Sequence, residues 1–282
     1  MTEKALDLTI SIVLYANSFE LVNRTIESVF NSDISFKLFL IDNSPTDQLR
    51  VLAKDKRIEY IFNNENIGFG RGHNKALELA LTRSEFHLVL NPDVYFDPPV
   101  LPTLLEFMGK DKEVGLIMPM VYNFDSEMQY LCRRLPTPID LVLRRFGGTF
   151  VDRLSRKRTE YYEMRDMDYK RMFTAPYLSG CFMLLRLEAL KNVGLFDERY
   201  FMYLEDIDLS RRVSEKYKTV YYPDAFVYHG HAKDSYTNFR LLGVHIKSAI
   251  KYFNKWGWFF DTHRKRMNTE IEYYSNSDKR QK

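Results

Sequence analysis

Three short polar clusters in this 282-residue chain carry side chains that could do chemistry. Acidic side chains occur in Asn91-Pro92-Asp93 and in Glu205-Asp206-x-Asp208, and two histidines occur in His229-Gly-His231. Carboxylates and neutral imidazoles bind divalent cations, and a carboxylate also takes a proton from an attacking hydroxyl group. The same acids could instead favour a helix start or make a turn, so both interpretations remain open at this point.

A fourth cluster is rich in glycine. Residues 66–74, Asn-Ile-Gly-Phe-Gly-Arg-Gly-His-Asn, hold three glycines and one arginine before a helical pattern. Glycine lets the backbone approach a ligand closely, and a helix start favours a phosphate. The spacing matches neither G-x-G-x-x-G nor a loop ending in G-K-[ST], so a Rossmann dehydrogenase and a P-loop NTPase are disfavoured.

Alternating strand and helix patterns in the first half must position these clusters. Apolar, β-branched runs predict buried strands over residues 8–15, 36–41, 57–62 and 86–90. Helical patterns lie between them, and one is expected over 74–82 after a polar loop at 63–73. This alternation predicts an α/β fold with a mostly parallel sheet and helices on both faces.

The residues that follow these four strands are polar or aromatic. They are Tyr15-Ala16-Asn17, Asp42-Asn43-Ser44, Asn63-Asn64-Glu65 and Asn91-Pro92-Asp93. Ligands of open α/β sheets bind beyond the carboxyl ends of the strands, so these segments should line one edge. Asp42 and Asp93 could there bind a base or ribose and a metal ion, although such residues also make turns.

The second half of the chain is less regular. Strands are predicted over 114–123, 179–187 and 219–229, and helices over 188–193 and 205–216. Residues 133–158 carry eight Arg or Lys against two Asp, and we expect an irregular, basic segment there. Residues 238–267 are predicted to be helical, with aromatic and lysine side chains interleaved, and 268–282 to be frayed.

Composition excludes several classes of protein. The balance of 41 basic and 38 acidic residues argues against a nucleic-acid binder, and two cysteines exclude a disulfide scaffold. Neither a signal peptide nor an apolar run long enough to span a bilayer is visible, so a cytoplasmic protein is expected. The 15% aromatic content is high, and a core alone does not account for it.

Six stretches of the chain, in order, resemble family 2 glycosyltransferases with the GT-A fold, and most of all the rhamnosyltransferase-like branch. They are SIVLYANSFELVNRTIESV, LFLIDNSPTD, NENIGFGRGHNKAL, LVLNPDVYF, LSGCFMLLRLEALKNVGLFDERYFMYLEDIDLSRRV and VYYPDAFVYHGHAKDS. The resemblance implies a Rossmann-like sheet flanked by helices over residues 1–237, followed by a C-terminal helical extension over 238–282. Residues 1–123 would form the nucleotide-sugar half and 124–237 the acceptor and catalytic half.

The resemblance also implies roles for individual residues on the donor side. Asn91 and Asp93 match the family's D-x-D element, with Asn91 in place of the first acid, and His229 matches a metal- or diphosphate-binding histidine. Asp93 and His229 would hold Mg²⁺ or Mn²⁺, with His231 as a competitor, and Lys233 and Ser235 could reach the diphosphate. The expected nucleotide-sugar-binding residues are Tyr15, Asp42, Asn66, Gly68, Arg71, Asn74, Asn91 and Asp93.

On the acceptor side, Asp206 matches the family's general base for inverting transfer, and Glu205 is the fallback. Arg133, Arg134 and Tyr203 are expected to face the acceptor, because lipid-linked glycans carry anionic diphosphates. The branch suggests dTDP-L-rhamnose as donor and a growing, lipid-linked surface glycan as acceptor.

Two questions stay open at this stage. The aromatic segment 252–260 could lie on the inner face of the cell membrane, pack on the core or join a homodimer. The alternative function is a non-catalytic nucleotide-sugar-binding or scaffold protein, suggested by the missing acid at Asn91. The joint presence of Asp93, Asp206 and His229 argues against that alternative. A sugar nucleotidyltransferase is disfavoured, because no Gly-rich basic loop follows the first strand.

Overall fold

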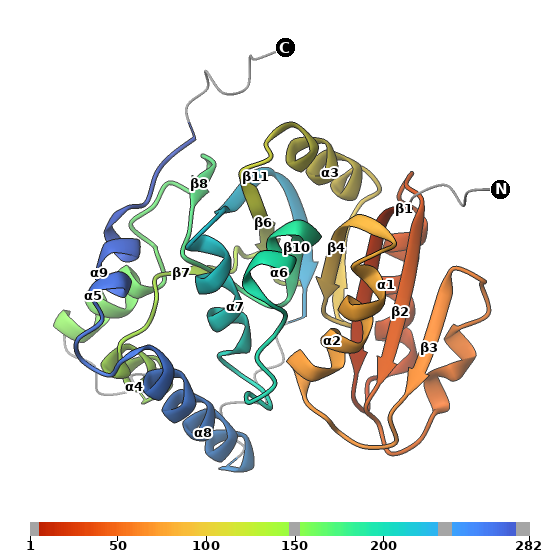
Figure 1. Cartoon of the computed structure of the whole chain (residues 1–282), viewed down its shortest axis with the longest axis horizontal. Helices are drawn as coiled ribbons and strands as arrows, with labels where there is room; N and C mark the ends of the chain where they lie inside the picture. Colours follow the sequence, from red (N-terminus) through yellow and green to blue (C-terminus); the bar gives the residue numbers. More distant parts are fainter. Residues whose placement is uncertain (1–5, 147–152, 231–238, 275–282) are drawn as a thin grey trace.

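The computed structural model describes residues 6–146, 153–230 and 239–274 (Figure 1). Within them one mixed sheet has the order β3-β2-β1-β4-β10-β6-β11-β5, with β8 added beside β11. Its strands are β1 (Leu6–Leu14), β2 (Phe36–Asp42), β3 (Ile58–Phe62), β4 (Ser84–Leu90), β5 (Val94–Tyr95), β6 (Val114–Tyr122), β8 (Phe173–Thr174), β10 (Phe182–Arg186) and β11 (Lys218–His229). A separate pair joins β7 (Cys132–Arg133) and β9 (Tyr177–Leu178).

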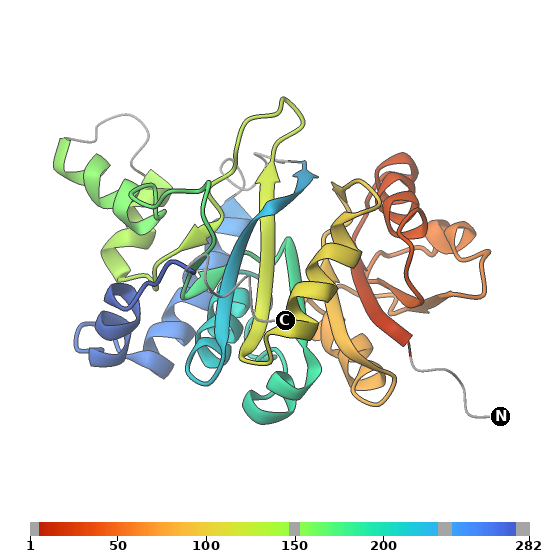
Figure 2. The same cartoon turned by 90° about the horizontal axis from the view of Figure 1, so that it is seen from above.

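Helices cover both faces of this sheet (Figures 1 and 2). They are α1 (Phe19–Phe30), α2 (Phe69–Ala80), α3 (Val100–Lys110), α4 (Pro138–Phe146), α5 (Arg153–Tyr162), α6 (Leu187–Val193), α7 (Glu205–Ser214), α8 (Phe239–Trp256) and α9 (Thr262–Thr269), besides a 3-10 turn at Gln48–Leu52. In Figure 1, α2, α6 and α7 lie in front of the sheet and α1 lies behind it. The predicted α/β architecture is confirmed.

Strand register brings the predicted edge together. β1, β2, β3 and β4 are parallel neighbours, with Leu14 opposite Asp42 and Asp42 opposite Phe62. β10 runs antiparallel to β4, so Phe182 lies opposite Leu90 and the start of β10 meets the end of β4. The segments that follow the first four strands therefore lie at one edge, as the sequence predicts.

The start of α2 differs from the prediction, because the helix begins at Phe69 rather than at Asn74. The glycines that suggested a loop serve close packing instead. A Cβ atom at Gly72 would lie 2.8 Å from the Val13 side chain, and one at Gly70 would lie 3.0 Å from Phe196. Glycine is needed at both positions so that this helix can approach β1 and the chain before α7.

The basic segment is also more ordered than expected. It forms β7, α4 and α5 on either side of an undescribed stretch, and Arg133 and Arg134 are 6% and 5% exposed. The high density of basic residues suggested a solvated loop and gave no sign of these helices. In α4, Leu141 is buried, whereas Ile139 and Val142 are exposed. The predicted irregular loop is wrong for the described part of this segment.

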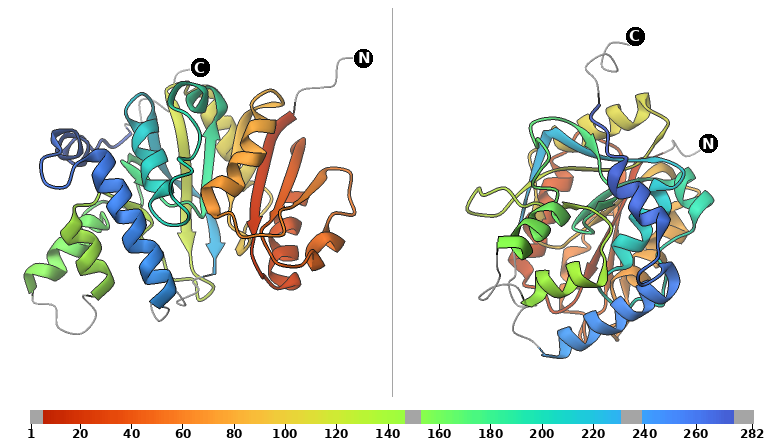
Figure 3. Two further views of the ribbon diagram at one scale, coloured as in Figure 1. Left: turned by 60° about the horizontal axis from the view of Figure 1, so that its bottom comes forward. Right: turned by 90° about the vertical axis from the view of Figure 1, so that its left-hand side faces the viewer.

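The C-terminal segment packs onto this same end of the molecule. α4, α5, α8 and α9 gather at the end remote from β3 (Figures 1 and 3). Tyr252 and Phe253 of α8 are buried, whereas Phe259 and Phe260 are 77% and 98% exposed. The prediction that the chain is frayed from residue 268 is wrong for residues 268–274, because the Tyr274 amide donates to the Met172 carbonyl at 3.0 Å.

Candidate active site

A cavity of about 300 Å³ lies at the carboxyl edge of the sheet, where β4, β10, β11 and α7 meet. It gathers residues that are far apart in the sequence, among them Asn91, Arg133, Tyr203, Glu205, Asp206 and His229. With Phe69 of the Gly-rich segment, five of the sequence-predicted segments therefore contribute to a single cavity. The strand ends bring them together, as expected for an open α/β sheet.

The Asn91, Asp93 and His229 side chains meet at one side of this cavity. His229 Nε2 lies 3.2 Å from Asn91 Nδ2 and 3.5 Å from an Asp93 carboxylate oxygen. The Gly230 amide donates to the Asp93 carbonyl at 3.0 Å, which fastens the end of β11 to the turn before β5. The fold thus brings together Asn91 and His229, which are 138 positions apart in the sequence.

Gln129 orients the His229 ring. Its Nε2 donates to the His229 carbonyl at 2.9 Å, so its Oε1, 3.2 Å from His229 Nδ1, is the acceptor. Nδ1 therefore carries the proton, and the Nε2 lone pair is directed toward Asn91 and Asp93. Such a partner on the far nitrogen is usual for a metal-binding histidine.

The donor atoms at this point fit a divalent metal ion. Burial raises the pKa of Asp93 to about 6, which reflects an acid placed where water does not compensate its charge. A carboxylate and an imidazole nitrogen suit Mn²⁺ or Mg²⁺, whose remaining ligands are commonly phosphate oxygens and water. Asn91 presents its Nδ2 to His229, so its amide would have to rotate to offer the oxygen to an ion. Within the described residues no cluster unites three or more His, Cys, Asp or Glu side chains, so Asn91 would have to complete the set.

Strained backbone precedes the acidic pair of α7. Tyr203 and Leu204 have φ values of +70° and +66°, in the left-handed region that such residues seldom adopt. Conformations of this kind cost of the order of 1–3 kcal/mol each and concentrate at functional sites. The turn delivers Glu205 and Asp206 to the cavity at the first residues of α7.

Asp206 is held by neutral donors. Its Oδ2 accepts hydrogen bonds from the Tyr177 hydroxyl and the Gly180 amide, both at 2.9 Å. Its Oδ1 accepts from the Ile207 amide at 2.9 Å. These bonds fix the direction of the carboxylate and leave lone pairs for a proton from a substrate hydroxyl.

Glu205 differs sharply from its neighbour. It is 4% exposed, and its Oε2 has no hydrogen-bond partner among the described residues. Burial, reinforced by the negative charge of Asp206, raises the pKa of Glu205 to about 8. Glu205 is therefore protonated at neutral pH, which makes Asp206 the better proton acceptor of the two.

Arg133 is linked to Asp206 through Tyr177. Its Nη1 donates to the Tyr177 hydroxyl at 3.4 Å, and that hydroxyl donates to Asp206. Arg134 points elsewhere: it forms a two-bond ion pair with Asp166 at 2.7 Å and does not line the cavity. The acceptor-side prediction is therefore wrong for Arg134, because that guanidinium is already neutralised inside the fold.

The nucleotide-side residues divide into exposed and buried groups. Tyr15 is 53% exposed at the end of β1, beside Ala16 with a φ of +52°. Asp42 is fully buried, and its two oxygens accept from the Tyr60 hydroxyl and from the Ser44 amide. Asp42 therefore holds the ends of β2 and β3 in place through these bonds, while the exposed ring of Tyr15 offers a surface on which a base could stack.

The Gly-rich segment fastens α2 to the chain that precedes α7. Asn66 Oδ1 accepts from the Gly68 amide at 3.0 Å, and Gly68 has a φ of +92°. Asn74 is buried, with its amide bonded to the backbone of Phe196 in both directions. Arg71 remains 56% exposed, 3.5 Å from a Glu198 oxygen. Of the predicted donor contacts here, Asn66 and Arg71 are exposed, whereas Asn74 is committed to positioning.

Four lining residues escaped the sequence reasoning: Gln129, Arg144, Tyr177 and His245. His245 comes from α8, with its ring centroid 5.2 Å from that of Tyr203, so the C-terminal extension helps to form the cavity. No motif marks these residues, and only their tertiary placement reveals them. The predicted alternatives His231, Lys233 and Ser235 lie outside the described residues.

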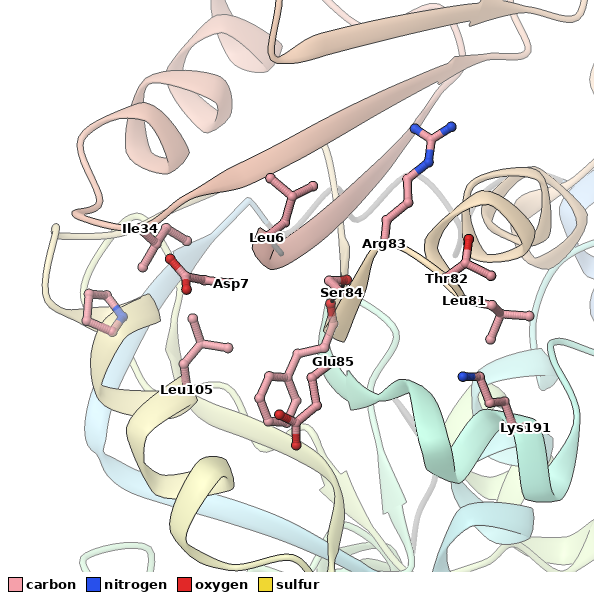
Figure 4. A pocket seen from close by; sticks show the side chains of 12 residues that line it. Leu6, Asp7, Ile34, Leu81, Thr82, Arg83, Ser84, Glu85, Leu105 and Lys191 are labelled. Atoms are coloured by element: carbon pink, nitrogen blue, oxygen red, sulfur yellow. Dashed lines mark hydrogen bonds between the residues drawn. The ribbon is translucent and has the colours of Figure 1, made fainter. Parts of the chain in front are cut away.

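A separate, wider hollow of about 830 Å³ lies at the amino ends of β1 and β4, on the opposite edge of the sheet. Figure 4 shows Leu6, Asp7, Arg83, Ser84 and Glu85 around it. None of the catalytic candidates lines it. Its chemistry gives no reason to place the active site there.

Comparison with known proteins agrees with this geometry. The family described as "Glycosyl transferase family 2" matches residues 10–194. The N-acetylglucosaminyl-diphospho-decaprenol L-rhamnosyltransferase of Mycobacterium tuberculosis is 30% identical over 68% of this chain, and the match spans 66% of the relative's length. Rhamnosyltransferase WbbL of Escherichia coli K12 is 23% identical, over 82% of this chain and 87% of its own.

Solved structures show the fold. A crystal structure of GalNAc-T7 with UDP, GalNAc and Mn²⁺ superposes with a TM-score of 0.58 at 14% identity, covering 80% of this chain and 43% of that one. At this identity the likeness concerns the GT-A architecture alone. The predicted GT-A fold is confirmed.

Proposed function

Because the chain belongs to glycosyl transferase family 2, we propose that it moves a sugar from a nucleotide-diphosphate donor to a hydroxyl group of a lipid-linked glycan. The observation that carries the proposal is the single cavity that unites Asn91 and His229 with Glu205 and Asp206. A donor diphosphate and an acceptor hydroxyl would each find their partners there within one open cavity. The rhamnosyltransferase relatives support an L-rhamnosyl donor, for which dTDP-L-rhamnose is our candidate.

On the donor side, Asp93, His229 and Asn91 would hold a divalent metal ion. Bound there, Mg²⁺ or Mn²⁺ would offset the negative charge of the departing nucleotide diphosphate. Gln129 keeps the His229 ring turned so that Nε2 faces this point. Arg71 and Tyr15, both exposed at the same edge, would contact the nucleotide or its sugar.

On the acceptor side, Asp206 would take the proton of the attacking hydroxyl group. The new bond joins that oxygen to the anomeric carbon, the bond from this carbon to the diphosphate breaks, and the configuration inverts. Tyr177 and the Gly180 amide hold the carboxylate in place through the step. Glu205, protonated at neutral pH, adds no second negative charge beside the base.

The exposed residues of the C-terminal extension support contact with the inner face of a cell membrane. Phe259 and Phe260 stand out from the surface, and Ile246 and Ile250 of α8 are 48% and 44% exposed. No helix in the described parts of the chain is long and apolar enough to cross a bilayer. Sedimentation with anionic vesicles tests the contact: Phe260→Ser should weaken it, and an unchanged vesicle affinity with a dimeric mass would instead favour a second copy of the chain.

A donor panel tests the proposed function. Titration calorimetry with dTDP-L-rhamnose, UDP-sugars and GDP-sugars should give tight binding of one nucleotide sugar with Mn²⁺ or Mg²⁺ and weak binding with EDTA. Asp93→Ala should abolish the metal response while the protein stays folded. Failure of every nucleotide sugar to bind would contradict the proposal, and a full metal response in Asp93→Ala would remove Asp93 from the site.

A further inference from the structure

A second cavity of about 490 Å³ adjoins the active-site cavity on its acceptor side. The two share Gln129, Leu131, Arg133 and Arg144 in their walls. Farther out, the second cavity is lined by the apolar side chains of Phe124, Met128 and Tyr130. The outer cavity also carries the charged side chains of Asp125, Glu127, Glu163 and Arg165. The shared wall is thus the junction between the inner space that contains Asp206 and an outer space where charged groups lie beside a few apolar rings.

Arg133 at this junction is a buried cation that pairs with no carboxylate in the described part of the chain. It is 6% exposed, its Nε has no hydrogen-bond partner among the described residues, and its Nη1 makes only a long bond, of 3.4 Å, to the neutral Tyr177 hydroxyl there. Leaving a buried charge unpaired is costly. Its neighbour Arg134, equally buried, is fully paired with Asp166, so this fold does neutralise an arginine whose role is structural.

Arg144 adds a second positive charge at the same junction. It lies on α4, lines both cavities, and makes no hydrogen bond or ion pair with the described residues. Of the carboxylates farther out in the second cavity, Glu163 pairs with Arg165 at 2.7 Å, Glu127 accepts from Asn123, and Asp125 is exposed to solvent. Two unpaired guanidinium groups at one junction favour an anion with several oxygens, because arginine binds phosphates through paired hydrogen bonds.

We propose that Arg133 and Arg144 bind the diphosphate of the acceptor itself, separately from the donor diphosphate at Asp93 and His229. The acceptor sugar then occupies the inner cavity with a hydroxyl group at Asp206, and the apolar chain leaves through the outer cavity past Phe124 and Tyr130. This assignment rests on the proposed function for the identity of the acceptor. It adds to the proposed function where the acceptor diphosphate binds and in which direction the lipid tail of the acceptor leaves.

Farnesyl diphosphate is a soluble probe of this site, and its binding is measured by calorimetry on the full chain without donor or metal. Arg144→Gln should weaken binding about 10- to 100-fold, the loss expected for one charged hydrogen-bonding group. Arg133→Met should do the same. Arg156→Gln is the matched control, because Arg156 belongs to the same basic segment but is 80% exposed. It should stay within about 2-fold of the parent protein, as an exposed pair contributes little.

A competition experiment separates this site from the donor site. Saturating dTDP with Mn²⁺ should leave farnesyl diphosphate binding in place, and farnesol should bind weakly to every variant. Displacement by dTDP, or equal affinity in Arg144→Gln and the control, would overturn the proposal. A third outcome would also overturn it: Arg133→Met alters the pH dependence of the transfer rate but leaves the farnesyl diphosphate affinity unchanged. Arg133 would then act only through Tyr177. Loss of nucleotide-sugar binding would refute the proposed function instead, and it would not alter this readout.

Discussion

Replacing Glu205 by glutamine should stabilise the protein, and more so as the pH rises. The pKa of Glu205 is about 8 in the folded protein and about 4.5 in the unfolded chain. Between these values the unfolded chain releases this proton and the folded protein keeps it, so stability falls as pH rises through the window. Each pH unit corresponds to about 1.4 kcal/mol, which gives about 3 kcal/mol between pH 5.5 and pH 8.5.

The measurement is thermal unfolding of the parent protein and Glu205→Gln at a series of pH values. For a chain of this length about 0.6 kcal/mol corresponds to 1 °C, so the difference in Tm should grow by about 5 °C between pH 5.5 and pH 8.5. Glu188→Gln, at an exposed position in the first turn of α6, is the control and should show no such growth. A constant difference in Tm across this range for Glu205→Gln would refute the buried, protonated state of Glu205.

Three further predictions concern positions outside the acidic pair. Gly68→Ala should abolish stable folding or lower Tm strongly, since its Cβ would lie 2.2 Å from the Phe201 carbonyl oxygen at a φ of +92°; an unchanged Tm would contradict this contact. Asp261→Ala should cost about 3–5 kcal/mol in urea unfolding, because it leaves Arg211, 2% exposed, as an unpaired buried charge. His87 has a pKa lowered to about 3 by burial, so below pH 6.5 the unfolded chain binds a proton that the folded protein does not. The parent protein should therefore lose about 1.4 kcal/mol more per pH unit on acidification than His87→Gln, and equal slopes would contradict this.

The strand edge was predictable because strand–helix alternation sets the order and direction of the first four strands. The placement of Asn91 and Asp93 at that edge follows from the end of β4 alone. Their meeting with His229 does not, because β11 reaches them only through its pairing with β6 and β5. The family resemblance supplied that contact where local pattern could not.

Two kinds of error arose from composition. Glycines at the start of α2 suggested a loop, but their function is close packing against Val13 and Phe196, which no local rule reports. The high charge of the segment after Arg133 concealed two helices and two buried arginines. Arg133 and Arg134 are adjacent and look alike in sequence, yet one lines the active-site cavity and the other is paired with Asp166.

The pair of variants Asp206→Asn and Glu205→Gln tests the central claim most directly. Both replace a carboxyl group by an amide of the same shape, and they differ by one position on α7. Single-turnover sugar transfer at neutral pH, with donor affinity measured in parallel, should fall about 100- to 10,000-fold in Asp206→Asn at unchanged donor affinity. Glu205→Gln should keep its transfer rate within about 10-fold, because it replaces a group that is already neutral. Normal transfer by Asp206→Asn, or an equal loss in Glu205→Gln, would contradict the assignment of Asp206 as the base.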